Sequence, residues 1–193
     1  MTAPGVRFLH GSGAGPDGGA VQLPRFEGSR AVWLFDPDDG PLPDTPAAAA
    51  ERVLPAVERM DAPRVLVGHS LGGAVALQLA AAAPGVVDGL VLIATGARLP
   101  VPDDALERAV DDIEGEARRL TGAAFADPTG PLVERARAAI VEGGSDALAS
   151  AYRACRAHDM RERLGDITAP ALVVAGARDP LTPPWLSSEL AEG

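Results

Sequence analysis

One serine in this sequence lies in a pattern suited to nucleophilic chemistry. An apolar run at residues 65–67 continues through G-x-S-x-G at residues 68–72 into an Ala- and Leu-rich stretch. A serine hydroxyl is a poor nucleophile at neutral pH, and a tight strand-to-helix turn displays it where a base can reach it. Gly68 and Gly72 keep such a turn free of side-chain clashes, and the helix start directs backbone N–H groups at a developing oxyanion. The pattern predicts Ser70 as the nucleophile. An incidental serine in a glycine-tolerant turn is the alternative, which the flanking strand and helix disfavour.

A carboxylate that could work with this serine follows late in the chain. Asp179 comes shortly after the apolar run at residues 171–175. Ligands of open α/β folds bind at the carboxyl ends of the strands, so an aspartate there is suited to orient a catalytic histidine. A turn aspartate that caps the helix near Pro183 is the alternative, and one residue can fill both roles.

Five short apolar runs without strict polar alternation predict buried parallel strands. They cover residues 6–9, 31–35, 65–67, 90–94 and 171–175, and helices are expected at residues 45–60 and 71–83. This alternation predicts a mostly parallel sheet flanked by helices. The 193 residues are enough for one sizeable core, so we expect a single α/β domain over residues 1–193.

Between the fourth and fifth predicted strands the pattern is helical throughout. Apolar residues recur at helical spacing over about residues 98–164, behind start signals at Asp103 and Ser145. This segment is expected to be a helical cap, with ordinary surface helices as the alternative. The only cysteine, Cys155, falls on an apolar helical stripe and is expected to be buried and inert.

Composition narrows the possible partners. A net charge of −10 repels phosphate backbones and argues against nucleic acid. The sequence has no lysine, which excludes Schiff-base chemistry on lysine. We expect no metal and no organic cofactor. No uninterrupted apolar run spans a membrane and no secretory signal stands at the start, so a cytoplasmic protein with a small-molecule substrate is expected. The oligomeric state is left open.

Residues 13–18 also fit the dinucleotide-binding spacing G-x-G-x-x-G, and Asp36 stands where a ribose-binding acid would. That site needs a helix that begins inside the glycine run, because the helix N-terminus holds the pyrophosphate. Pro16 and Pro24 break such a helix. Nucleotide binding is therefore the less favoured function.

Three motifs, in this order, resemble those of the α/β-hydrolase superfamily, in particular its capped esterase-like members. They lie at residues 8–13, 68–73 and 173–183, so the resemblance covers nearly the whole chain. It implies that the backbone N–H groups of Ser12 and Leu71 form the oxyanion hole. It also implies that His10 and Gly11 lie in the substrate site with His69, a structural histidine beside the nucleophile.

The resemblance also implies a base that this sequence lacks. In the superfamily the triad order is Ser, acid, His, yet no histidine follows Asp179. We therefore expect a fold that is incomplete at the C-terminus, with a truncated chain that is weakly active or inactive and an exposed apolar edge on the last strand. His158 is expected on the opposite side of the sheet from the active site, which makes it the less favoured candidate for the base.

The function that follows is hydrolysis of an ester or related acyl substrate through an acyl-enzyme. Ser70 disfavours the dehalogenase and epoxide-hydrolase chemistries, which use aspartate at this position. Cofactor-free haloperoxidase, carbon–carbon hydrolase and peptidase chemistries stay open. A non-catalytic binding module with the same fold is the alternative from another functional class.

Overall fold

A four-stranded parallel sheet forms the centre of the computed structural model, which describes residues 5–14 and 42–193. The strand order is β1 (Gly5–Leu9), β2 (Arg64–His69), β3 (Gly89–Ile93) and β4 (Ala171–Val174). Each pair of neighbours is parallel. The carboxyl ends of all four strands therefore meet at one edge. Four of the five predicted strands are confirmed, and the one predicted at residues 31–35 lies outside the described residues.

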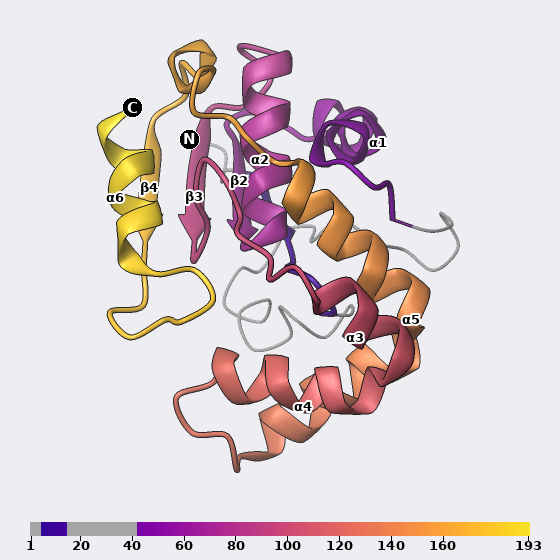
Figure 1. The fold of residues 1–193 in the computed structure, drawn as a ribbon. Coiled ribbons are helices and arrows are strands. Elements are labelled where there is room, and N and C mark those ends of the chain that lie inside the picture. Colours follow the sequence, from indigo (N-terminus) through magenta and orange to yellow (C-terminus); the bar gives the residue numbers. More distant parts are fainter. Residues whose placement is uncertain (1–4, 15–41) are drawn as a thin grey trace.

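Two helices expected from the sequence belong to the same core as this sheet. Helix α1 (Pro46–Glu58) begins at Thr45, whose hydroxyl accepts a hydrogen bond from the Ala48 N–H at 3.2 Å. Helix α2 (Leu71–Ala82) is apolar almost all round, and it is buried against α1, the first three strands and α5 (Figure 1). A helix with no polar face is stable only inside a core. Both predictions are confirmed to within two residues at each end.

The chain between β3 and β4 is helical, as predicted. It contains α3 (Ala105–Asp111), α4 (Ile113–Ala124), α5 (Pro131–Ala157) and the 3₁₀ turn η4 (Leu164–Asp166). Helices α3 and α4 lie beyond the end of the sheet to which the strand arrows point (Figure 1). We call residues 98–164 the helical insertion.

Helix α5 joins the insertion to the sheet. It bends at Gly144, which has a φ of 83°, so its second half begins at the predicted start signal Ser145. Before and just after the bend, Ile140 and Leu148 pack in a small core of the insertion. Further along, Ala151 and Ala154 belong to the main core. The last turns of α5 therefore help to join the insertion to the main core, as do Leu99 and Leu164 at its two ends.

Strand β4 forms an edge of the described sheet. It pairs with β3 on one side, and α6 (Pro184–Glu192) packs against it. Leu172 is 60% exposed and Val174 is 42% exposed. The expected exposed apolar edge is thus confirmed for the described residues.

Among these residues, no helix has both the length and the apolar character needed to cross a membrane.

Candidate active site

Ser70 occupies a strained turn between β2 and α2. Its φ is 52° and its ψ is −120°, a conformation that L-amino acids rarely adopt. Its carbonyl oxygen accepts hydrogen bonds from the N–H groups of Gly73 at 2.8 Å and Ala74 at 3.2 Å, which begin α2. The serine therefore stands at the N-terminus of a buried helix, and it remains partly accessible to solvent.

The glycines around Ser70 are required by close backbone contacts. A Cβ on Gly72 would collide with the carbonyl oxygen of Leu9 in β1. A Cβ on Gly68 would stand 2.6 Å from the carbonyl oxygen of Gly72 and from the Cα of Gly73. The prediction that Gly68 and Gly72 keep the turn free of clashes is confirmed. Their role goes further, because Gly72 also lets α2 approach β1.

The loop after β1 lies directly against this serine. A Cβ on Gly11 would be 3.1 Å from the Ser70 Cβ and 3.0 Å from the His69 Nδ1. The next residue, Ser12, has its hydroxyl oxygen 3.6 Å from the Cys155 Sγ of helix α5. Residues predicted from two distant motifs, Gly11 and Ser12 in one and Ser70 in the other, thus converge at the same sheet edge.

His10 in this loop is buried, and its Nδ1 lies 3.0 Å from the carbonyl oxygen of Gly11. Burial lowers the pKa of His10, and this effect outweighs the carbonyl contact, which raises it. These effects together favour the uncharged form of the imidazole. Such a ring suits a structural role in the loop.

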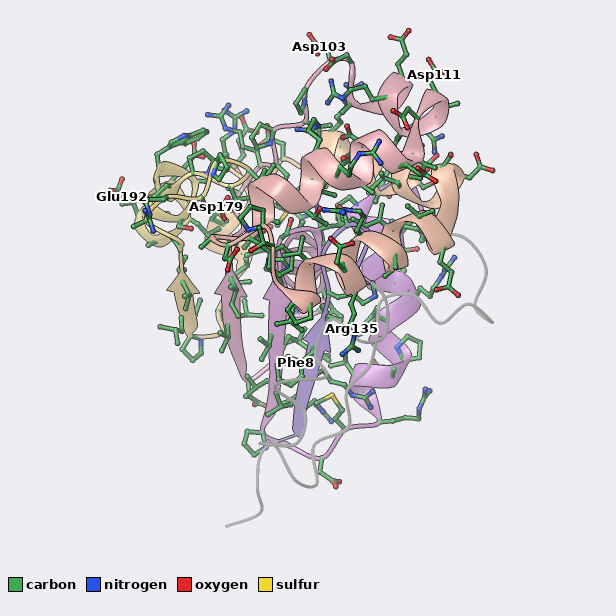
Figure 2. All side chains as sticks on the ribbon, turned by 90° about the horizontal axis from the view of Figure 1, so that it is seen from below. Phe8, Asp103, Asp111, Arg135, Asp179 and Glu192 are labelled. Atoms are coloured by element: carbon green, nitrogen blue, oxygen red, sulfur yellow. The ribbon has the colours of Figure 1, made fainter. Side chains whose placement is uncertain are left out.

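Asp179 follows β4 and is held by the turn that comes after it. Its Oδ1 accepts hydrogen bonds from the N–H groups of Leu181 and Thr182, each at 2.9 Å, and its Oδ2 accepts one from the Thr182 hydroxyl at 2.8 Å. The turn-capping role weighed in the sequence analysis is therefore present. In Figure 2, Asp179 lies at the end of the sheet to which the strand arrows point.

Electrostatics also relate Asp179 to the serine turn. His69 is partly exposed to solvent. Burial of its ring nevertheless lowers the pKa of His69, and the negative charge of the Asp179 carboxylate raises this pKa in part. Asp179 therefore acts on the residue next to Ser70. Among the described residues, no hydrogen bond joins Asp179 to the Ser70 hydroxyl, so a further group would have to connect them.

The predicted position of His158 was wrong. Its Nε2 lies 3.0 Å from the carbonyl oxygen of Gly96, just beyond the carboxyl end of β3. The sequence analysis placed it at the opposite edge because α5 leads toward the start of β4. The chain instead crosses the end of β3 before η4, where the Met160 N–H donates to the carbonyl oxygen of Ala97 at 2.7 Å.

Cys155 is buried, as predicted, and burial raises the pKa of its thiol to about 11. The thiol therefore stays protonated at neutral pH, which fits an unreactive residue.

Within residues 5–14 and 42–193, no group of three or more His, Cys, Asp or Glu side chains is arranged to hold a metal ion. Most of the G-x-G-x-x-G spacing, from Gly15 on, lies outside the described residues, as does Asp36.

Sequence reasoning missed Thr95, which is fully buried and donates its hydroxyl to the Ser70 carbonyl oxygen at 2.9 Å. A polar residue just past the end of a predicted central strand is the signal that could have found it.

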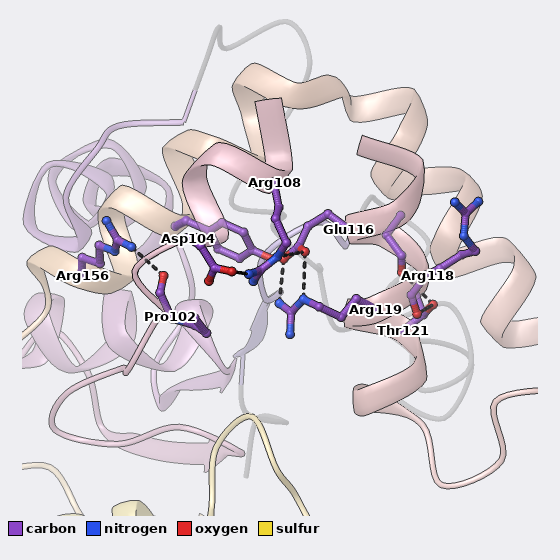
Figure 3. Close-up of polar contacts among 10 residues, drawn as sticks. Pro102, Asp104, Arg108, Glu116, Arg118, Arg119, Thr121 and Arg156 are labelled. Carbon is purple, nitrogen blue, oxygen red and sulfur yellow. Dashed lines mark hydrogen bonds and ion pairs between the residues drawn. The ribbon is translucent and has the colours of Figure 1, made fainter. Parts of the chain in front are cut away.

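Sequence reasoning also missed a charged cluster in the insertion, centred on Glu116 (Figure 3). The spacing of Glu116 and Arg119 on one helix hinted at a pair, but the other partners come from α3 and α5.

The chain is similar to known proteins in sequence and in fold. The sequence profile of the family described as "Alpha/beta hydrolase family" matches residues 8–193. A pimeloyl-[acyl-carrier protein] methyl ester esterase of Neisseria meningitidis serogroup B is 30% identical, over 96% of this chain and 78% of its own length. A putative carbamate hydrolase, RutD, of Variovorax paradoxus is 35% identical, over 78% of this chain and 62% of its own length.

A solved structure of a thermophilic esterase superposes with a TM-score of 0.82 at 26% identity, and covers 98% of this chain and 77% of its own. An enol-lactonase of Burkholderia xenovorans, with a TM-score of 0.84 at 20% identity, shares the fold over the whole chain and 80% of its own length. The chain therefore belongs to the alpha/beta hydrolase family, a family of hydrolytic enzymes.

Proposed function

We propose that this protein hydrolyses carboxylic esters of small molecules through an acyl-enzyme formed on Ser70. The observation that carries the proposal is the strained turn at the N-terminus of α2, against which Gly11 packs. Two similar proteins support the ester class: the Neisseria relative is named an esterase, as is the thermophilic structure.

In this mechanism the Ser70 Oγ attacks the ester carbonyl carbon while its proton passes to a base. The Leu71 and Ser12 N–H groups donate to the oxyanion of the tetrahedral intermediate. That intermediate collapses, and the alcohol leaves with the proton from the base. Water then attacks the acyl-enzyme by the same route, and releases the acid and the free Ser70 hydroxyl.

The other predicted residues have supporting roles in this proposal. Asp179 would orient an imidazole base and stabilise its charged form. His10, Gly11 and His69 border the substrate beside Ser70. The helical insertion caps the site, because α3 and α4 lie beyond the carboxyl ends of the strands (Figure 1).

The base is the component that the sequence does not supply. None of its three histidines, His10, His69 and His158, follows Asp179. The rings of His10 and His158 lie against backbone carbonyl groups, and His69 precedes the serine on the strand. We therefore expect this chain to retain only the catalysis of an oxyanion hole and binding, roughly 10³- to 10⁴-fold over water in triad enzymes.

Added imidazole tests the proposal, because it can enter the site and accept the proton. A fluorophosphonate probe forms a covalent adduct on an activated serine, and mass spectrometry of the peptides identifies the labelled residue. We expect imidazole to accelerate labelling at Ser70 by about tenfold or more, since general-base catalysis contributes roughly 10²- to 10⁴-fold. Ser70→Ala should abolish labelling, and Asp179→Asn should reduce the acceleration by imidazole.

A non-catalytic binding module of the same fold is the second candidate function. It predicts no adduct at Ser70 with or without imidazole, and that result would refute the catalytic proposal.

We also propose a cytoplasmic location, which cell fractionation tests.

A further inference from the structure

We infer that Thr95 is a positioning residue for the nucleophile: its hydroxyl fixes the carbonyl of Ser70 and thereby the strained turn that displays the serine. This inference rests on the proposed function, because it concerns the reactivity of Ser70. It starts from the β3 exit segment, which we define as residues 94–97, directly after β3. The segment is buried apart from partial exposure at Ala94.

Both backbone polar groups of Ser70 are bound to the end of β3. The Ser70 N–H donates to the carbonyl oxygen of Ile93 at 2.9 Å. The Thr95 hydroxyl donates to the carbonyl oxygen of Ser70 at 2.9 Å. The peptide groups on either side of the Ser70 Cα are thus held by one neighbouring segment. Since φ and ψ of a residue are rotations between these two peptide groups, the two bonds restrain both angles.

The exit segment is itself bent by a second strained residue. Ala94 has a φ of 48°, a left-handed conformation that is unfavourable for an L-residue. Its N–H donates to the carbonyl oxygen of Val174 in β4 at 2.9 Å, so the bend occurs where two strands still touch. The bend directs Thr95 toward the serine turn. Strain of this kind persists where surrounding contacts fix the conformation, and it gathers at functional sites.

Gly73 makes room for this contact. A Cβ on Gly73 would stand 2.6 Å from the Cγ2 and 2.7 Å from the hydroxyl oxygen of Thr95. Gly73 lies outside G-x-S-x-G and has an ordinary helical position in α2. Thr95 can contact the first turn of α2 only because Gly73 has no side chain. This contact explains why glycine stands at position 73.

The exit segment is also fixed on its far side. The Ser187 hydroxyl of α6 donates to the carbonyl oxygen of Thr95 at 3.4 Å. The ring of His158 binds the carbonyl oxygen of Gly96. The exit segment therefore connects the serine turn to the helix that follows Asp179 and to the end of the insertion. The backbone that carries the Thr95 hydroxyl is thus itself held in place.

A packing role and a positioning role for Thr95 predict opposite rankings of two variants. Thr95→Val keeps the shape and removes the hydroxyl, whereas Thr95→Ser keeps the hydroxyl and removes the methyl group. If Thr95 positions Ser70, Thr95→Val should lower the maximal rate of fluorophosphonate labelling roughly 10- to 100-fold, the cost of a misplaced reacting group. The probe concentration at half-maximal rate should stay unchanged. Thr95→Ser should label at close to the wild-type rate.

The experiment measures labelling at Ser70 over a range of probe concentrations, with imidazole present in every sample. Urea unfolding of each variant separates a loss of rate from a loss of stability. Thr95→Ala serves as a partner for Thr95→Ser, because this pair differs in the hydroxyl alone. The pair gives the same comparison if Thr95→Val does not fold.

The inference is overturned if Thr95→Val labels as fast as the wild type, or if Thr95→Ser loses as much rate as Thr95→Ala. Failure of the proposed function gives a different pattern, in which the wild-type chain itself forms no adduct at Ser70. That result would remove the basis of the inference as well.

Discussion

The serine turn and the helical insertion both depend on buried polar groups, but only those of the insertion are charged. Around Ser70 the turn is held by backbone hydrogen bonds and by the neutral hydroxyl of Thr95, and glycines allow the backbone segments to approach closely. In the insertion the centre is the carboxylate of Glu116, whose side chain has no exposed surface. The turn is therefore sensitive to the size of side chains, and the insertion is sensitive to charge and pH.

Glu116 accepts hydrogen bonds from three side chains on three helices (Figure 3). Arg108 of α3 and Arg119 of α4 each donate an Nε–H to its Oε2 at 2.8 Å, and the Arg119 Nη2 and the hydroxyl of Tyr152 in α5 each donate to its Oε1 at 2.6 Å. Burial raises the pKa of this carboxyl, but the hydrogen bonds outweigh burial and lower its pKa to about 2. One carboxylate thus joins α3, α4 and α5.

Removal of this carboxylate should have the largest effect on stability. We expect Glu116→Ala to lower the free energy of unfolding by about 3 kcal/mol, because it leaves the Arg119 guanidinium and the buried Tyr152 hydroxyl without this acceptor, while Arg108 keeps only Asp104. Urea unfolding followed by circular dichroism measures this. Glu114→Ala is the matched control on the same helix, since Glu114 makes only a 3.7 Å surface pair with Arg118. A loss at Glu116 no larger than that of the control would contradict the central place of the cluster.

The serine turn should respond as strongly to one added methyl group. We expect Gly72→Ala to destabilise the protein by about 3 kcal/mol, because its Cβ would meet the Leu9 carbonyl group and force α2 away from β1. Gly122→Ala is the control, because nothing lies within 4 Å of its added Cβ. The control should be neutral or stabilising by up to about 1 kcal/mol, since alanine favours helix. Equal unfolding midpoints for the two variants would rule out the tight contact.

Acid should weaken the insertion through Glu116. Its pKa is about 2 in the folded chain against a reference of 4.5, so its contribution is complete above pH 4.5 and is lost as the pH falls toward 2. Between pH 5 and pH 3 this amounts to about 2 kcal/mol. Other carboxyl groups titrate there too, so the quantity to measure is the difference in pH dependence between wild type and Glu116→Gln. Parallel stability curves would contradict the assignment.

A smaller and stabilising change in the free energy of unfolding is expected when the backbone strain at Ala94 is relieved. Ala94→Gly should stabilise the chain by up to about 1 kcal/mol, since glycine adopts the left-handed conformation without the Cβ clash. Ala138→Gly, in the exposed part of α5, should destabilise by a similar amount. These two identical substitutions should therefore shift the thermal midpoint in opposite directions, and shifts of the same sign would contradict the strain at Ala94.

The two regions also differ in what the sequence could predict. The serine turn follows local rules: an apolar strand, glycines at fixed spacing and an apolar helix. The position of the turn and the bounds of α2 were therefore predicted within a residue or two. Thr95 was not, because its partner is 25 residues away and the bend at Ala94 has no sequence signal. The Glu116 cluster was missed for the same reason, as Tyr152 is 36 residues away. His158 was misplaced because the path of the chain between α5 and β4 depends on tertiary packing.

The most direct test of the account is a crystal structure of the chain after reaction with a fluorophosphonate. We predict phosphorus bonded to the Ser70 Oγ, with the phosphoryl oxygen within hydrogen-bond distance of the Leu71 and Ser12 N–H groups and on the same side of the sheet as Asp179. An adduct on another residue, or a phosphoryl oxygen turned away from both N–H groups, would contradict the proposed site.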